Sequence, residues 1–224
     1  MRNVSRKTHP LTRKLLRDVA FCRNVKQRVD AAAEIVSALP QTLADIETLL
    51  SHAPHSVSRE VQYSVLNMLD WSGMRPLHVK KLFPIVLELL YEVNFSTAIL
   101  WMKIGCILGD GFLNAADQST RKRIVVELLN ALRSAPSVYS RRAAFHAIEH
   151  ALNTASLSEG KMMLDVIHET ALRDRAPSLR RSAFGMLRDG YWWGNRGLPK
   201  LHTYARKHGA ALRVEDYCHE NWFV

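Results

Sequence analysis

The sequence predicts an all-α fold built from stacked pairs of helices, and three observations support this. Adjacent leucines at positions 49/50, 89/90 and 128/129 recur after 40 and then 39 residues. A second series of segments, each opening with Ala-Pro near positions 53, 135 and 176, is offset from the first. No segment alternates convincingly between apolar and polar residues, as a half-buried strand would. Two interleaved series with a period near forty indicate helix pairs that bury their apolar stripes by stacking on their neighbours.

The elements follow in order along a single domain spanning 1–224. We expect an N-terminal helix pair over 10–39, four central repeats over 41–193 and a C-terminal cap over 194–224. In the first helix of a repeat, apolar residues lie three or four positions apart, as in Leu82, Val86 and Leu89. In the second series a proline ends one helix and a serine caps the next.

One segment carries a family resemblance. Residues 174–187 read D-x-x-P-x-L-R-x-x-A-x-x-x-L, from Asp174, Pro177, Leu179, Arg180, Ala183 and Leu187. This pattern resembles the start of the second helix in HEAT repeats, and Pro84 is similar to the proline common in their first helix. The resemblance covers about 41–193. It implies an α-solenoid of antiparallel HEAT-like pairs, about five to six over the chain, wound as a right-handed superhelix.

Charge and cysteine content narrow the class of protein. The net charge of +10 is concentrated: 1–28 hold nine Lys/Arg against one acid, and 173–213 hold ten against two, so each segment contributes +8. Concentrated positive charge attracts polyanions. Three widely spaced cysteines predict a reduced, cytoplasmic protein without disulfides. No segment is apolar enough to span a membrane, and the basic N-terminus favours a first solenoid helix over a transit peptide.

Two arginine pairs, Arg141-Arg142 and Arg180-Arg181, occupy the first turns of expected helices. Cations are unfavourable there by about 0.3 kcal/mol or more, because the helix dipole is positive at that end. For the first arginine of each pair we favour an internal acidic partner in the neighbouring repeat, such as Asp174.

The second arginines, Arg142 and Arg181, favour an external anion, and Arg188 follows seven residues later on nearly the same helical face. Guanidinium groups beside helix N-termini suit phosphate groups. The partner expected is nucleic acid, DNA before RNA, or an acidic protein. We expect the basic run Arg121-Lys122-Arg123 to extend this row. The predicted nucleic-acid-binding set is Arg141, Arg142, Arg180, Arg181, Arg188, Trp192, Trp193, Arg196 and Lys200.

The aromatic members of that set have two interpretations. Trp192 and Trp193, close to Arg196 and Lys200, are suited to stacking on unpaired bases. Bulky residues in a terminal repeat are also suited to sealing the exposed end of its core. The second interpretation is preferred.

No cofactor and no metal are predicted. The segment HAIEH, with His146, Glu149 and His150, has the spacing of inverted zinc peptidases, in which a glutamate activates water. The repeat places both histidines away from the buried side, however, and the sequence indicates no third ligand. The segment GCILGDG lacks the lysine of a phosphate-binding loop, and we expect Gly109 or Gly111 to end a helix.

An enzymatic alternative rests on a second resemblance. RRAAF (141–145) and ILGDGFL (107–113) are similar to motifs of the HEAT-like DNA alkylation repair glycosylases, in which the position of Arg142 contacts the DNA backbone. That resemblance also implies a catalytic aspartate shortly before LGD, where this chain has no acid between Asn94 and Gly109. The preferred function is therefore a non-catalytic binding module, with a glycosylase or a protein–protein scaffold as alternatives and with the catalytic residues unknown.

Overall fold

The described part of the chain is mainly helical. The computed structural model describes residues 74–94, 98, 100–189 and 199–210, and these contain no strand. The all-α prediction is confirmed for these residues. The expected N-terminal pair at 10–39 and most of the expected cap at 194–224 lie outside the described residues. None of the described helices has the length and apolar character needed to cross a membrane.

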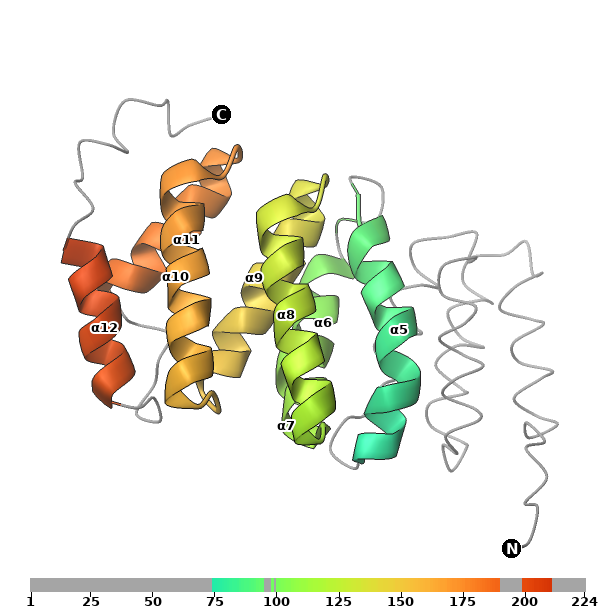
Figure 1. Ribbon diagram of the computed structural model, residues 1–224. Helices are drawn as coiled ribbons and strands as arrows, with labels where there is room; N and C mark the ends of the chain where they lie inside the picture. Colours follow the sequence, from blue (N-terminus) through green and yellow to red (C-terminus); the bar gives the residue numbers. More distant parts are fainter. Residues whose placement is uncertain (1–73, 95–97, 99, 190–198, 211–224) are drawn as a thin grey trace, which may run out of the picture.

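The helices keep the labels of Figure 1. They are α5 (Pro76–Glu92), α6 (Leu100–Cys106), the π-helical segment η2 (Ile107–Phe112), α7 (Leu113–Ala115), α8 (Gln118–Ser134), α9 (Val138–Leu152), α10 (Leu157–Arg173), α11 (Pro177–Asp189) and α12 (Pro199–Ala210).

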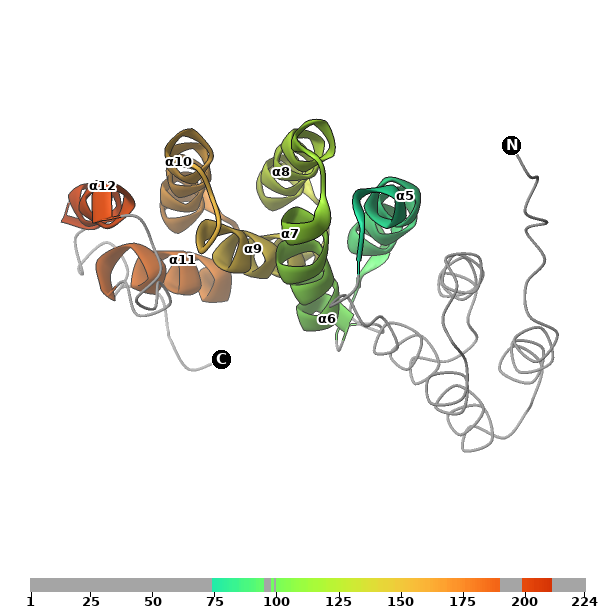
Figure 2. The ribbon, with the colours of Figure 1, turned by 90° about the horizontal axis from the view of Figure 1, so that it is seen from below.

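These helices lie in two layers. Seen from below, α5, α8, α10 and α12 form one layer, and α6, α9 and α11 form the other (Figure 2). A continuous apolar core runs between the layers and includes Leu82 of α5, Ile148 of α9 and Leu201 of α12, all fully buried. Each helix alone leaves its apolar stripe open, so the stripe is buried only by its neighbours.

Local sequence explains where the helices begin. Ser137 caps α9, since its hydroxyl accepts a hydrogen bond from the Tyr139 amide at 3.2 Å. Ser156 and Glu159 form a reciprocal capping box at the start of α10. The serine-cap prediction is wrong for α11, which begins at Pro177 with Ser178 already inside the helix. A proline is favourable at that position because the first helical N–H has no partner in the helix.

The prediction that Gly109 or Gly111 ends a helix is wrong. Both are buried in η2, which joins α6 to α7 without a break. A β-carbon on Gly105 would lie 2.9 Å from the Ala143 carbonyl oxygen, and one on Gly109 would lie 2.6 Å from the Ala147 carbonyl oxygen. These glycines therefore allow α6 and η2 to pack directly on the backbone of α9.

Candidate functional site

The first arginine of the α9 pair is internal. Arg141 is only 2% exposed. Its guanidinium group binds the Asp174 carboxylate in a bidentate manner, at 2.7 and 3.1 Å, and also donates to the Ala135 carbonyl at 2.9 Å. The interpretation as an internal pair is confirmed. As a correction, Arg141 is removed from the nucleic-acid-binding set because its donors are already used away from solvent.

The first arginine of the α11 pair has a related role. Arg180 is half-buried and donates from Nη1 to the Asp174 carbonyl oxygen at 2.6 Å. Asp174 thus accepts hydrogen bonds from Arg141 on its carboxylate and from Arg180 on its backbone carbonyl oxygen. These two arginines hold the junction between α10 and α11. Arg180 is therefore not part of the proposed ligand surface.

The second arginines lie at the surface of the α9–α11 layer. Arg142 is half-buried, and its Nη2 donates to the Ser178 hydroxyl at 2.6 Å. Arg181 and Arg188 are exposed on α11, where Arg188 lies over the Phe184 ring with its guanidinium carbon 5.6 Å from the centroid. Ser178 and Arg181 are three residues apart on one helical face. We call Arg142, Arg181 and Arg188 the arginine row.

The remaining members of the predicted set are placed less fully. Lys200 belongs to α12, and only its backbone is described. Trp192, Trp193 and Arg196 lie outside the described residues.

The basic run Arg121-Lys122-Arg123 does not extend the arginine row. It belongs to α8, in the opposite layer (Figure 2). The Arg121 guanidinium pairs with Glu159 at 3.1 Å and donates to the Leu113 and Thr154 carbonyl oxygens at 2.7 and 3.3 Å. Arg121 thus connects α8 to the segments on either side.

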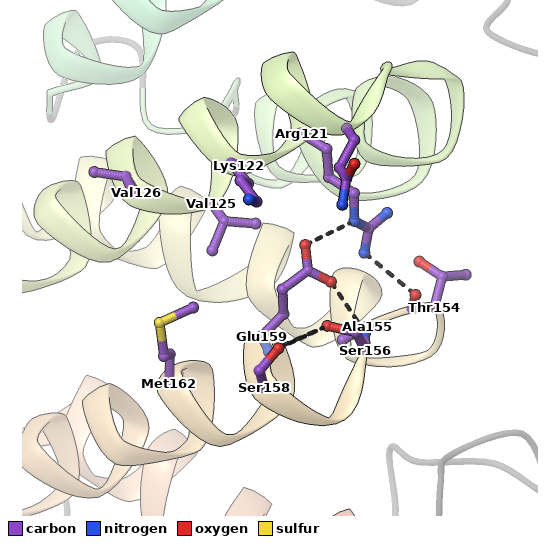
Figure 3. Close-up of a pocket in the computed structure, with 11 residues that line it drawn as sticks. Arg121, Lys122, Val125, Val126, Thr154, Ala155, Ser156, Ser158, Glu159 and Met162 are labelled. Atoms are coloured by element: carbon purple, nitrogen blue, oxygen red, sulfur yellow. Dashed lines mark hydrogen bonds and ion pairs between the residues drawn. The ribbon is translucent and has the colours of Figure 1, made fainter.

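A groove lies between α8 and α10, with a volume of about 740 Å³ (Figure 3). The Arg121–Glu159 pair lies at one end, and Glu159 also accepts from the Ser156 amide at 3.0 Å. Val125 and Met162 line another part of the groove. Arg121 and Glu159 are thus paired with each other, and their arrangement is explained by helix packing.

A second site joins residues from α6 and α9. Cys106 lies at the end of α6, and His146 and His150 lie one turn apart on α9. The Cys106 Sγ is 3.5 Å from His146 Nε2 and 4.0 Å from His150 Nε2, and the two Nε2 atoms are 3.3 Å apart. We call these three residues the Cys-His cluster.

Each histidine of the Cys-His cluster is oriented by a carboxylate. His146 Nδ1 is 2.9 Å from Glu149 Oε2, and His150 Nδ1 is 2.7 Å from Asp110 Oδ2. Trp101 packs edge-on against the His146 ring, with centroids 5.5 Å apart. The side chains of His146 and His150 are 20% and 28% exposed, so solvent reaches the cluster.

The close packing of α6 and η2 on α9 assembles this site. Gly105 and Gly109 each directly precede a residue of the site, Cys106 and Asp110. Since a β-carbon on either glycine would collide with the α9 backbone and with the β-carbon of His146 or His150, the absence of a side chain lets their neighbours come within contact of the histidine rings. A π-helical turn often marks a functional position in a helix, and here it carries Asp110.

The groups of the Cys-His cluster shift each other's pKa values. Hydrogen bonds from His146 and His150 outweigh burial and lower the pKa of the Cys106 thiol to about 6. Burial acts to lower the pKa of His146, but its bonds to Cys106 and Glu149 prevail and raise that pKa to about 9. The bond to Cys106 also raises the pKa of His150. The arrangement thus favours a thiolate close to positive charge.

Cys106 was not predicted from the sequence as a partner of the two histidines. The HAIEH spacing suggests a water-activating Glu149, whereas the structure shows Glu149 bound to His146 Nδ1. A usable signal was present in the repeat. With Trp101 aligned to Phe145, Cys106 falls at the position of His150. In a stack of repeats, equivalent positions on neighbouring second helices lie side by side, so this alignment predicts a contact between Cys106 and His150.

No family model, no curated protein and no solved structure matches this chain. The arginine row and the Cys-His cluster are the candidate functional features of the described residues.

Proposed function

We propose that this chain is a HEAT-like α-solenoid that binds nucleic acid, DNA before RNA, through the arginine row on α9 and α11. The observation that carries the proposal is the contact between Arg142 and Ser178. This hydrogen bond of 2.6 Å holds the Arg142 guanidinium group of α9 against the first turn of α11. Ser178, which accepts it, lies three residues before Arg181. The row therefore continues from one helix to the next, as a phosphate backbone would require.

The chemistry of the row supports a phosphate ligand. A guanidinium group offers several N–H donors in a planar fork that fits phosphate oxygens. Arg142 and Arg188 are also held over aromatic rings, of Tyr139 and Phe184, with guanidinium carbons 5.9 and 5.6 Å from the centroids. Such contacts restrict the side chains and reduce the entropy lost on binding.

The distribution of charge supports the same ligand. Residues 173–213 carry ten basic against two acidic side chains, a net charge of +8, and α11 with Arg181 and Arg188 lies within this segment. Contacts limited to phosphates do not read base sequence. The expected binding is therefore strong at low salt and weakly dependent on sequence.

The test is a salt titration of binding to labelled duplex and single-stranded DNA. In the triple variant Arg142→Gln, Arg181→Gln, Arg188→Gln, the slope of log affinity against log salt should fall by about 1 per arginine, because a DNA phosphate that no longer meets an arginine keeps its bound counterions. The melting temperature should change little, since these side chains lie at the surface.

The matched control removes the same charge from α8 in the opposite layer: Lys122→Gln, Arg123→Gln, Arg133→Gln. This variant should keep most of the wild-type affinity and slope. Equal reductions of affinity in the two triple variants would contradict a localised site. Tighter binding to an acidic polypeptide than to DNA at equal charge would instead assign the row to an acidic protein partner.

The glycosylase alternative receives no support from the carboxylates near Trp101. Asp110 and Glu149 are each engaged by a histidine of the Cys-His cluster. The alternative predicts abasic sites after incubation with alkylated DNA, and their formation would replace the binding function with an enzymatic one.

A further inference from the structure

We propose that Cys106, His146 and His150 bind a zinc ion through three protein ligands and leave a fourth position open to solvent. The distances between the ligand atoms fit this ion. In a tetrahedral site with Zn–N bonds of about 2.05 Å and a Zn–S bond of about 2.3 Å, neighbouring ligand atoms lie about 3.3 Å (N to N) and about 3.6 Å (N to S) apart. The observed distances are 3.3 Å between the nitrogens and 3.5 and 4.0 Å from nitrogen to sulfur.

The carboxylates set the histidines up as ligands. Glu149 and Asp110 lie within hydrogen-bond distance of the two Nδ1 atoms, and a carboxylate accepts the Nδ1 proton. In a neutral ring the Nε2 lone pair is then left without a proton. A carboxylate behind each histidine ligand is the common outer arrangement at protein zinc sites, where it fixes the ring and increases its basicity.

The convergence of these atoms suits a metal ion. Two Nε2 atoms 3.3 Å apart and a sulfur within 4.0 Å of both place three potential metal ligands together. A proton bridges only two of the three atoms, whereas a metal ion contacts all three, and one thiolate with two imidazoles suits zinc.

The exposure of the site distinguishes its type. Structural zinc sites have four protein ligands, and sites with three keep a position for water or another ligand. Among the residues that the structure describes, Cys106, His146 and His150 are the group able to coordinate a metal ion. Since His150 is 28% exposed, water can occupy the remaining position.

A rival explanation is a nucleophilic cysteine activated by a histidine. One imidazole and one carboxylate suffice for that chemistry. The Cys-His cluster has two imidazoles, each with its own carboxylate, at the distances expected for joint coordination. The zinc proposal accounts for the second pair, His150 and Asp110, whereas the rival does not.

The experiment uses the full chain, loaded with one equivalent of Zn²⁺ after chelator treatment. We expect one zinc per chain after desalting and a rise in melting temperature on loading, because a ligand that binds the native state stabilises it. With Co²⁺ as a probe, a tetrahedral d–d spectrum with a thiolate-to-cobalt charge-transfer band should appear. Zinc should also slow the alkylation of Cys106 by iodoacetamide.

The variants Cys106→Ser and His150→Gln should lose the bound metal and the charge-transfer band. Glu149→Gln should weaken zinc binding by about 10–100-fold while keeping the stoichiometry. The matched controls are His168→Gln and Glu169→Gln, and both should bind zinc like the wild type. His168 packs against another histidine, His208, with ring centroids 4.7 Å apart. Circular dichroism of each variant checks that it folds.

The three ligands of one chain should bind one zinc ion. If the folded wild-type chain binds less than about half an equivalent of zinc, the proposal is overturned. Alkylation of Cys106 at the same rate with and without zinc would favour the nucleophile instead. These readouts need no nucleic acid, so the zinc site and the arginine row can fail independently.

Discussion

At the scale of single residues, adjacent arginines have opposite roles. Arg141 is buried against Asp174, whereas Arg142 reaches Ser178 at the surface. Successive residues of a helix point about 100° apart, so one arginine of a pair enters the junction between α10 and α11 while the other faces solvent. The unfavourable position of a cation in the first helical turn is offset for Arg141 by a bidentate carboxylate.

The buried pair gives a stability prediction. Arg141→Ala should lower the free energy of unfolding by about 3–5 kcal/mol, because it leaves the Asp174 carboxylate without its partner in a site where the two side chains are 3% and 6% exposed. Urea denaturation measures this change. The control is Arg133→Ala, which breaks the Arg133–Glu169 pair, 47% and 43% exposed; it should cost only about 0–1 kcal/mol. Similar changes in both variants would contradict the assignment of Arg141 as a structural residue.

At the scale of elements, the contact of α6 and η2 with α9 assembles the Cys-His cluster. Gly105 and Gly109 have no side chain to separate these backbones. Cys106 and Asp110 follow them in sequence, and both reach α9. The glycines are thus required by close approach rather than by a turn.

This contact predicts the effect of a methyl group. Gly109→Ala places a β-carbon 2.6 Å from the Ala147 carbonyl oxygen and 2.7 Å from the His150 β-carbon. It should destabilise the fold by about 1–3 kcal/mol through overpacking, although alanine normally stabilises a helix relative to glycine by about 1 kcal/mol. Zinc binding should weaken as well.

The comparison variant is Gly160→Ala in α10. There the new β-carbon meets the methyl groups of Leu201, which are the end of a side chain rather than backbone. It should therefore cost less than Gly109→Ala when both are measured by thermal and urea unfolding. A larger cost for Gly160→Ala would contradict a rigid backbone contact at Gly109.

Across the molecule as a whole, α9 is the most enclosed of the described helices. It packs on α5, α6, η2, α8 and α10, whereas α12 packs on α10 and α11 at one end of the described layers (Figure 1). In such a stack the stability of each helix depends on its direct neighbours.

This arrangement predicts a gradient of hydrogen exchange. Under native conditions the amides of α9 should exchange most slowly and those of α12 faster, because α12 can open without exposing the central core. Exchange followed by mass spectrometry measures the gradient. Equal protection of α9 and α12 would indicate that the described helices unfold together as one unit.

The helical class and an internal acidic partner for Arg141 could be predicted from the amino-acid sequence. The first depends on the 3.6-residue spacing of apolar residues along the chain, and the second on the resemblance to HEAT repeats. The geometry of the Cys-His cluster was decided by the tertiary structure, because the close packing of α6 and η2 on α9 brings Cys106 and Asp110 to histidines about 40 residues away. Spacing sets which face of a helix a residue occupies. The depth of contact between two helices, which turns faces into a site, is decided by how their side chains pack.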